Sequence, residues 1–175
     1  MHITLIRHLP TEWNKAQKLQ GRKDIDLDPI TEDFMSKIEE NKVLLNVFAP
    51  FDLVLASTLK RTHQTAKLYG YKPETDALLD ELDFGPYEGR SKEELIAAYE
   101  HQWLENPKNL ILGESLVNLE NRVTSFLEKY RGYSNLLVFG HGSWIRAIVS
   151  YYHYGDINKM NKMTVDNNQC IRLRF

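Results

Sequence analysis

The sequence of 175 residues lacks the features that mark several classes of protein. It has a single cysteine, Cys170, which excludes an intrachain disulfide and a four-cysteine metal site. No apolar run approaches the roughly 20 residues that a membrane-spanning helix needs. The apolar run from Met1 to Ile6 is too short for a secretory signal, because Arg7 and His8 end it. We therefore expect a cytoplasmic protein with no membrane partner.

The chain also has no large excess of positive or negative charge. Lys and Arg number 22 and Asp and Glu number 24, so the formal net charge is −2 at pH 7. A chain without a strong positive charge does not attract nucleic acid, so we expect no nucleic-acid partner. Hydrophobic residues make up 42% of the chain and charged residues 26%, as in an ordinary globular protein. The length and the absence of repeats and linker-like segments favour one domain over residues 1–175.

Three short apolar segments predict a layered fold. Each ends in polar residues, which is typical of buried parallel strands; they span residues 3–8, 52–57 and 135–141. Helical patterns cover residues 31–48, 58–69, 91–104, 115–130 and 143–154. The expected N-caps include Thr31, Ser57 and Ser91. Strands that alternate with helices indicate a three-layer α/β/α fold with a mostly parallel sheet.

A further segment, 170–175, alternates in polarity and predicts a last strand at an edge of the sheet. An edge strand either closes the sheet or pairs with another chain. The sequence thus allows a homodimer without requiring one.

The predicted strand ends carry the side chains that suit a reaction. Ligands of open α/β sheets bind outside the carboxyl ends of the strands. Arg7 and His8 follow the first strand, Arg61 follows the second, and His141 ends the third. Two guanidinium groups beside two imidazoles suit a phosphate dianion, because each guanidinium matches two phosphate oxygens. Neighbouring cations also disfavour the imidazolium, which leaves a histidine neutral and nucleophilic.

The leaving group of such a reaction needs a proton donor, and the acid-rich loop 80–89 supplies candidates. Glu81 starts the loop, while Asp83 and Glu88 are rivals on spacing alone. A carboxyl beside a phosphate dianion has its pKa raised and can act as a general acid. A metal site of two histidines and a carboxylate is disfavoured, because the adjacent arginines repel a cation. We expect no metal and no cofactor.

The helix after the second strand adds a further element. Ser57, Arg61 and Thr65 follow one another at intervals of four residues, which predicts that they share one helix face. Arg61 leans back toward the strand end, because helical side chains point toward the N-terminus. The positive end of the helix dipole also favours an anion there.

Five motifs in one order resemble the histidine phosphatase superfamily, which includes the cofactor-dependent phosphoglycerate mutases. They are RHLPTEWN at 7–14, GRKDIDLDPIT at 21–31, ASTLKRTHQTA at 56–66, LDELDFGPYEGRS at 79–91 and VFGHGSWIRA at 138–147. The resemblance implies a phosphoglycerate mutase-like fold and a phosphohistidine intermediate at His8. It implies that Arg7, Arg61 and His141 hold the phosphoryl oxygens and that Glu81 donates the proton. The implied phosphate and substrate pocket also includes Asn14, Gln20, Gly21 and Gly142.

Leu9 and Pro10 depart from the family pattern, which usually has glycine and glutamate there. If the glycine position requires a positive φ, Leu9 costs on the order of 1–2 kcal/mol. If the position must be small, Leu9 crowds the pocket instead. Neither effect removes a catalytic group.

The resemblance favours a metal-independent phosphomonoesterase that acts on a small phosphorylated metabolite. Phosphoglycerate mutases carry a long insertion with an arginine pair after the loop that holds the proton donor. This chain has only a short cap region around 85–112 there, without an adjacent arginine pair. Two alternatives stay open: mutase-type phosphoryl transfer, and a weakly active or inactive phosphate-binding regulatory module, which rests only on Leu9 and Pro10.

Overall fold

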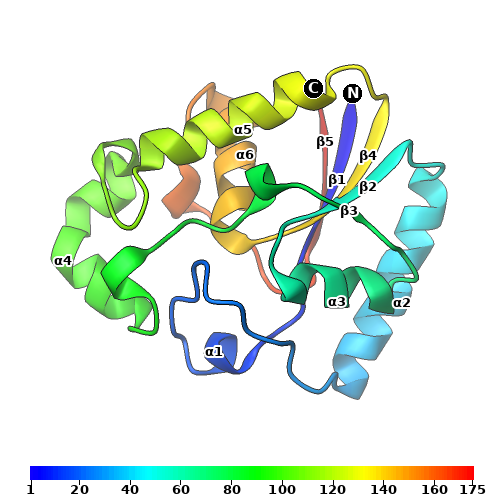
Figure 1. Ribbon diagram of the computed structural model, residues 1–175, viewed down its shortest axis with the longest axis horizontal. Coiled ribbons are helices and arrows are strands. Elements are labelled where there is room, and N and C mark those ends of the chain that lie inside the picture. Colours follow the sequence, from blue (N-terminus) through cyan, green and yellow to red (C-terminus); the bar gives the residue numbers. More distant parts are fainter.

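The computed structural model describes residues 1–175 and contains a five-stranded sheet with helices on both faces (Figure 1). The strands lie in the order β3-β2-β4-β1-β5. They are β1 His2–Arg7, β2 Leu53–Ala56, β3 Glu74–Thr75, β4 Asn135–Gly140 and β5 Cys170–Arg174. The first four strands run parallel, whereas β5 pairs antiparallel with β1 at one edge. The predicted mostly parallel sheet and its terminal edge strand are confirmed.

Six α-helices surround the sheet, and most begin close to where the sequence patterns place them. They are α1 Glu12–Lys15, α2 Glu32–Phe48, α3 Lys60–Leu68, α4 Lys92–Glu105, α5 Leu116–Tyr130 and α6 Gly142–Tyr154. Thr31 and Ser91 are confirmed as N-caps, because their side chains accept hydrogen bonds from the backbone of Phe34 and Glu94. None of the helices has the length and apolar character needed to cross a membrane.

The predicted N-cap at Ser57 is wrong. Helix α3 begins at Lys60, and its N-cap residue is Leu59, whose side chain makes no capping bond. The backbone N–H of Lys60 is instead taken by the carboxylate of Asp24, at 2.9 Å, so this helix end already has an anionic partner. Of the three residues predicted to share a helix face, Arg61 and Thr65 lie inside α3, and Ser57 does not. Ser57 lies before the helix, where its Oγ accepts the N–H of Leu59 at 3.1 Å and also bonds to His141, as described below.

Successive side chains of the strands alternate between two hydrophobic cores. Ile3 and Leu5 of β1 belong to the larger core, with α5 and α6. Ile6 of β1 and Phe139 of β4 belong to the second core, with α2 and α3. Figure 1 shows these helix pairs on opposite sides of the strands. The period-two pattern of a strand thus produces the predicted three layers.

The strand register brings the predicted functional residues to one edge of the sheet. Arg7 of β1 lies opposite Gly140 of β4, and Ala56 of β2 lies opposite Phe139 of β4. The residues that follow these positions leave the sheet side by side. His8, Ser57 and His141 therefore meet, as expected for the carboxyl ends of neighbouring parallel strands.

The segment predicted as a short cap consists of α4 between two 3-10 helices, Gly85–Tyr87 and Pro107–Asn109. Figure 1 shows α4 far from the strands, at the side of the molecule that α1 and the loop after β1 also approach. The loop pairs with the segment before α4, where Lys18 and Ser91 form an antiparallel bridge. The loop and α4 form two walls of one cavity.

Candidate active site

His8 immediately follows β1, and its ring is buried, with 2% of the residue exposed. Its Nδ1 lies 2.7 Å from the carbonyl oxygen of Leu9. A carbonyl only accepts, so Nδ1 carries a proton and Nε2 of the neutral ring keeps its lone pair. Burial, followed by Arg61 and Arg7, holds the pKa of His8 well below its ordinary value of 6.5. The ring is therefore neutral at pH 7, with an unprotonated Nε2, as a nucleophile requires.

The backbone around His8 is fixed by contacts from three distant segments. The N–H of His8 donates to Gly140 O at 3.0 Å, and Asn167 Nδ2 donates to His8 O at 2.9 Å. The N–H of Leu9 donates to Thr65 Oγ1 at 3.0 Å. The same Leu9 residue accepts the bond from the ring of His8. Thr65 of α3 thus fixes the peptide that orients the imidazole.

His141, the N-cap residue of α6, is fully buried beside His8, and the two ring centroids are 5.3 Å apart. Its Nε2 lies 2.7 Å from Ser57 Oγ, whereas its Nδ1 is buried without a partner. A hydroxyl donates or accepts, so Ser57 can pair with Nε2 in either protonation state. Burial, Arg61 and His8 hold the pKa of His141 well below 6.5. This side chain is a neutral imidazole with one nitrogen that has no partner in the protein.

The two arginines are held by backbone carbonyls rather than by carboxylates. Arg61 donates from Nη1 to Lys23 O and from Nη2 to Gly21 O, both at 2.8 Å. Arg7 donates from Nη1 to Val165 O at 2.6 Å. The Nε–H of each arginine is buried without a partner. Burial lowers the pKa of Arg61 to about 10, so it is still a cation at pH 7.

The unpaired Nε–H donors of Arg7 and Arg61 indicate what kind of ligand the cavity suits. A buried donor without a partner costs about 1–3 kcal/mol. Here both belong to cations that line the same cavity as His8. An anion in that cavity would satisfy both donors and neutralise part of the charge. The arrangement therefore suits a tetrahedral oxyanion such as a phosphoryl group.

Glu81 reaches the site from the loop 80–89, which follows the 3-10 helix Ala77–Leu79. Its Oε1 accepts three backbone N–H groups: those of Leu82 at 2.9 Å and of Ser143 and Trp144 at 3.1 Å. Its Oε2 shares only the N–H of Ser143, at 3.0 Å. Because Oε1 is already saturated, Oε2 is the oxygen with room for a proton. The carboxyl lines the cavity and is 8% exposed.

The rival carboxyls are engaged outside the cavity. Asp83 accepts from Gly85 N at 2.8 Å, and Glu88 accepts from Arg22 N at 2.8 Å. Neither lines the cavity that holds His8. Of the three carboxyls considered from the sequence, only Glu81 lies where it can meet a ligand.

Two glycines shape the cavity wall. Gly21 has φ +52°, a conformation that strains other residues, and a Cβ there would displace the carboxylate of Glu88. A Cβ on Gly142 would lie 3.3 Å from Arg7 Cζ, so the missing side chain lets Arg7 pack against α6. Both glycines lie in the cavity wall.

Asn14 and Gln20 occupy the same wall. The Oδ1 of Asn14 accepts from Thr11 N at 3.1 Å, which forms the capping box of α1. This bond leaves the amide NH2 of Asn14 without a partner in the protein. Gln20 is buried, and its Oε1 also has no partner. Both amides are thus placed to bind a ligand.

The cavity has a volume of about 430 Å³. It unites nearly the whole predicted set, whose members in its wall are Arg7, His8, Asn14, Gln20, Gly21, Arg61, Glu81 and Gly142. His141 lies behind this wall, against the ring of His8. In the whole chain, no three His, Cys, Asp or Glu side chains are grouped as metal ligands would be.

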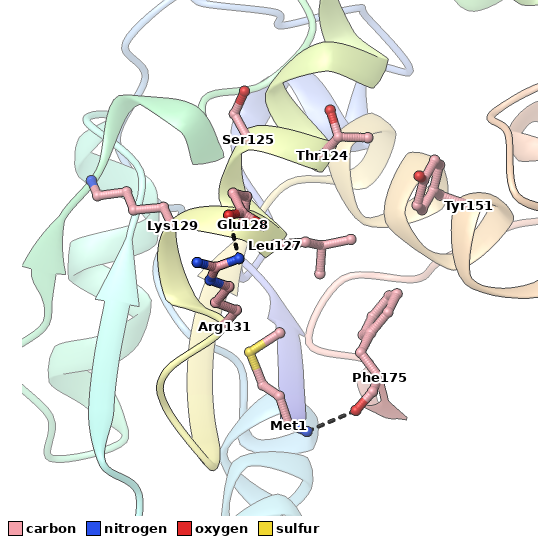
Figure 2. Close-up of a pocket in the computed structure, with 9 residues that line it drawn as sticks. All are labelled: Met1, Thr124, Ser125, Leu127, Glu128, Lys129, Arg131, Tyr151 and Phe175. Atoms are coloured by element: carbon pink, nitrogen blue, oxygen red, sulfur yellow. Dashed lines mark hydrogen bonds and ion pairs between the residues drawn. The ribbon is translucent and has the colours of Figure 1, made fainter.

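A larger cavity, of about 860 Å³, lies elsewhere (Figure 2). Met1 and Phe175 form one side of it, joined by a bond of 2.7 Å from the terminal amine to Phe175 O. It therefore lies at the amino end of β1, whereas His8 follows the carboxyl end. Its wall contains no histidine, no cysteine and none of the predicted residues. Size alone does not identify the site, and the smaller cavity is the one with converging reactive groups.

Neither of the two costs expected for Leu9 is present. Outside glycine, a positive φ occurs only at Gln17, Glu100 and Asn168, so the backbone of Leu9 is not in the left-handed region. The Leu9 side chain is fully buried in the second core and is absent from the cavity wall. Leucine fits because its side chain turns away from the cavity and into the second core.

The structure also brings in residues that sequence reasoning missed. Ser57 bonds to His141, and Asn167 bonds to the backbone of His8. Lys92 of α4 and Arg146 of α6 line the cavity. A signal existed for Arg146, because it lies one helical turn after Gly142 and hence on the same face of α6. No sequence pattern marks Asn167, which contacts the site through the loop before β5.

Comparisons with known proteins show which family the chain resembles. The profile of the "Histidine phosphatase superfamily (branch 1)" matches residues 3–175. A "Putative phosphoserine phosphatase 2" from Hydrogenobacter thermophilus is 32% identical over 84% of this chain and 76% of its own. An "Uncharacterized phosphatase PhoE" from Bacillus subtilis is 32% identical over 97% and 85%. A "Probable phosphoglycerate mutase GpmB" from Yersinia enterocolitica is 30% identical over 86% and 74%.

A solved structure is similar in fold. It is that of the product of open reading frame Rv3214 from Mycobacterium tuberculosis, with a TM-score of 0.83. The match covers 99% of this chain and 91% of the other, at 24% sequence identity. The sheet, its order and the helices around it are thus shared with a protein of known structure.

Proposed function

Because the chain belongs to the histidine phosphatase superfamily, we propose that it is a metal-independent phosphomonoesterase that works through a phosphohistidine at His8. One observation carries the proposal: a neutral, buried His8 lies between Arg7 and Arg61, whose buried Nε–H donors lack partners. A phosphate monoester would satisfy those donors and place its phosphorus beside a free Nε2. The names of the relatives, most of them phosphatases, support the same reaction class.

In the first step, the Nε2 lone pair of His8 attacks phosphorus and forms an N–P bond. The P–O bond to the alcohol breaks, and its electron pair goes to the ester oxygen. Glu81 gives the proton held on Oε2 to this oxygen, so the alcohol leaves as a neutral molecule. The positive charge that develops on the imidazole is stabilised by the Nδ1–H bond to Leu9 O, at 2.7 Å.

In the second step, a water molecule attacks phosphorus from the side that the alcohol has left. Glu81, now a carboxylate, takes a proton from this water. The N–P bond breaks, its electron pair returns to Nε2, and inorganic phosphate leaves. Arg7, Arg61 and His141 stabilise the charge on the phosphoryl oxygens in both steps, and this stabilisation is the main requirement of phosphoryl transfer.

Mutase-type transfer is the second candidate, favoured by the relative described as a probable phosphoglycerate mutase. The two reactions share the first step and differ in the acceptor. Residues 90–112 form only α4 and a 3-10 helix, so little protein covers the cavity. An open cavity admits water as the acceptor, which favours hydrolysis over transfer to a second hydroxyl.

The test is to trap the phosphoenzyme. The protein is mixed with p-nitrophenyl phosphate or with O-phosphoserine, the substrate suggested by the H. thermophilus relative. Rapid quenching in base, followed by peptide mapping, is expected to locate an acid-labile phosphate on His8. Glu81→Gln should release product more slowly and accumulate this species, because it lacks the ionisable group for both proton transfers.

The matched control is His153→Asn, which changes an exposed histidine on α6. It should behave as wild type, whereas His8→Asn should lose both the label and the phosphate release. Phosphate release without a label on His8 would refute the intermediate. No phosphate release from any ester would refute the enzyme itself, and formation of 2-phosphoglycerate from 3-phosphoglycerate and 2,3-bisphosphoglycerate would identify a mutase.

A further inference from the structure

The turn before β5, residues 165–169, holds Arg7 in three places. The N–H of Asn168 donates to Arg7 O at 3.0 Å, and the N–H of Arg7 donates to Gln169 O at 3.2 Å. The guanidinium of Arg7 donates from Nη1 to Val165 O at 2.6 Å. A segment near the end of the chain thus fixes both the main chain and the side chain of the residue before His8.

Asn167, in the same turn, holds the peptide that follows the proposed nucleophile. Its Nδ2 donates to His8 O at 2.9 Å. The N–H of this peptide, which belongs to Leu9, donates to Thr65 Oγ1 at 3.0 Å. The next carbonyl, Leu9 O, accepts the 2.7 Å bond from the imidazole Nδ1 of His8. The peptide between His8 and Leu9 is therefore held at both of its polar groups, and the carbonyl that follows it sets the direction of the imidazole.

The amide of Asn167 is oriented by its neighbours. His8 O only accepts, so the group of Asn167 that faces it is the NH2. The same Nδ2 lies 3.4 Å from Asn14 Oδ1, which also accepts the N–H of Thr11. Asn167 thus contacts the backbone of the nucleophile and the amide of Asn14, whereas it does not itself line the cavity. Any effect of Asn167 on a ligand passes through these two residues.

The turn is anchored on the side away from the cavity. Asn168 is buried and has φ +65°, a left-handed conformation that asparagine adopts more readily than most residues. Its Oδ1 accepts from Tyr69 Oη at 2.5 Å, and its O accepts from Asn41 Nδ2 at 2.8 Å. Burial raises the pKa of Tyr69 to about 12, so the hydroxyl keeps its proton and donates. These contacts with α2 and the end of α3 fix the turn, and the turn presents Asn167 to His8.

We propose that Asn167 is a positioning residue for the phosphorylation of His8, a role that rests on the proposed phosphomonoesterase. Its hydrogen bond to His8 O fixes the peptide after the nucleophile and so keeps the Nε2 lone pair directed at phosphorus. Asn167 itself neither binds the phosphoryl group nor transfers a proton. Without its NH2 group, Thr65 alone holds this peptide, and the imidazole loses a fixed direction. Misaligned reacting atoms slow bond formation even where the substrate still binds.

The rate at which phosphohistidine forms tests this role. The protein is mixed with saturating p-nitrophenyl phosphate, and rapid quenching in base measures how fast the label appears on His8. Asn167→Ala and Asn167→Leu should both lower this rate about tenfold, the effect of one hydrogen bond, and should change substrate affinity less. Asn167→Gln keeps an amide donor and should restore part of the rate.

The alanine and leucine variants together separate positioning from packing. Alanine leaves space and leucine fills it, but neither side chain donates a hydrogen bond. Asn167 is half-buried in a turn, so its variants are expected to fold, and a thermal melt checks each one. The rate constant of labelling, unlike its amplitude, does not depend on the fraction of active protein. Asn46→Ala, which changes an exposed asparagine of α2, is the matched control and should keep the wild-type rate.

The outcomes separate this inference from the proposed function. Labelling of His8 at the wild-type rate constant in both Asn167→Ala and Asn167→Leu would overturn the positioning role and leave the phosphatase intact. A slow Asn167→Ala beside an Asn167→Leu that reacts like wild type would overturn it as well, because Asn167 would then only fill space. Absence of label and of turnover in wild type would instead refute the phosphatase.

Discussion

Replacing Leu9 by glycine, the residue usual in the family, should destabilise this protein without improving its activity. Leu9 is fully buried and packs in the second core with Ile6, Ile38 and Phe139. The leucine is thus a core residue that happens to follow the proposed nucleophile. The family residue is expected to leave a cavity here, since the surrounding side chains are arranged around a leucine.

The magnitude follows from the burial. Removing a fully buried leucine side chain down to alanine costs about 2–5 kcal/mol. Glycine adds about 0.5–1 kcal/mol, because the unfolded chain gains backbone freedom. For a chain of this size each kcal/mol lowers Tm by about 2–4 °C, so a total of about 3–6 kcal/mol corresponds to a fall of roughly 6–24 °C.

The assay combines a thermal melt with steady-state kinetics well below the melting range. Leu9→Gly should retain kcat/KM for p-nitrophenyl phosphate within about threefold, because Leu9 O and Leu9 N still make their bonds to His8 and Thr65. Leu104→Ala is the matched control: that leucine is 40% exposed, and its truncation should shift Tm by no more than a degree or two.

A particular result would refute this reasoning. If Leu9→Gly had the same Tm as wild type and hydrolysed esters many times faster, leucine would be an obstruction in the active site rather than a core residue. The regulatory-module hypothesis, which rests on Leu9 and Pro10, would then gain support. A large fall in Tm with unchanged kinetics would remove that support.

Two further predictions follow from the histidines and their partners. Ser57→Ala should lower kcat about tenfold, because it removes the bond to His141 Nε2 and leaves the N–H of Leu59 unpaired. The control Ser125→Ala, on the exposed face of α5, should not change kcat. Equal values of kcat for Ser57→Ala and wild type would show that the Ser57 hydroxyl does not position His141. The free energy of unfolding should fall as pH drops below the ordinary histidine pKa of 6.5. In that range His8 and His141 bind protons in the unfolded chain but stay neutral in the folded protein, where burial lowers their pKa. The slope should reach about 1.4 kcal/mol per pH unit for each histidine, and urea unfolding between about pH 5 and 8 should show a shallower slope in His8→Asn than in wild type or His153→Asn.

The sequence predicted the sheet and the strand ends because buried parallel strands are continuous apolar runs. A run such as 135–141 stops where the chain leaves the sheet, so its last residue marks the ligand edge. Elements of two to four residues, such as β3 and α1, escaped prediction because no periodic pattern develops over that length. The short strand β3 forms only because β2 is already there to pair with it.

The place of Lys92 in the cavity wall was beyond the reach of the sequence for a different reason. Lys92 and Arg146 lie 54 positions apart by their numbers, on two helices whose approach depends on how α4 folds back over the cavity. A lysine in the first turn of a helix is ordinarily a solvated residue. That Lys92 faces the cavity depends on how α4 packs, which no local pattern reveals.

The wrong N-cap prediction at Ser57 shows how a contact with a distant residue can override a local capping preference. A serine before a helix is a good N-cap in isolation, but the Ser57 hydroxyl is 2.7 Å from the buried Nε2 of His141 and accepts the N–H of Leu59, before the helix begins. An unpaired buried imidazole nitrogen costs more than an exposed helix N–H that water or Asp24 can satisfy. The four-residue spacing of Ser57, Arg61 and Thr65 therefore serves three different ends. Ser57 bonds to the second histidine, Arg61 lines the cavity beside the first, and Thr65 bonds to the peptide that follows the first. One short stretch of chain, 57–65, thus contacts the surroundings of both imidazoles, whose neighbourhood is set by the pairing of β1 with β4.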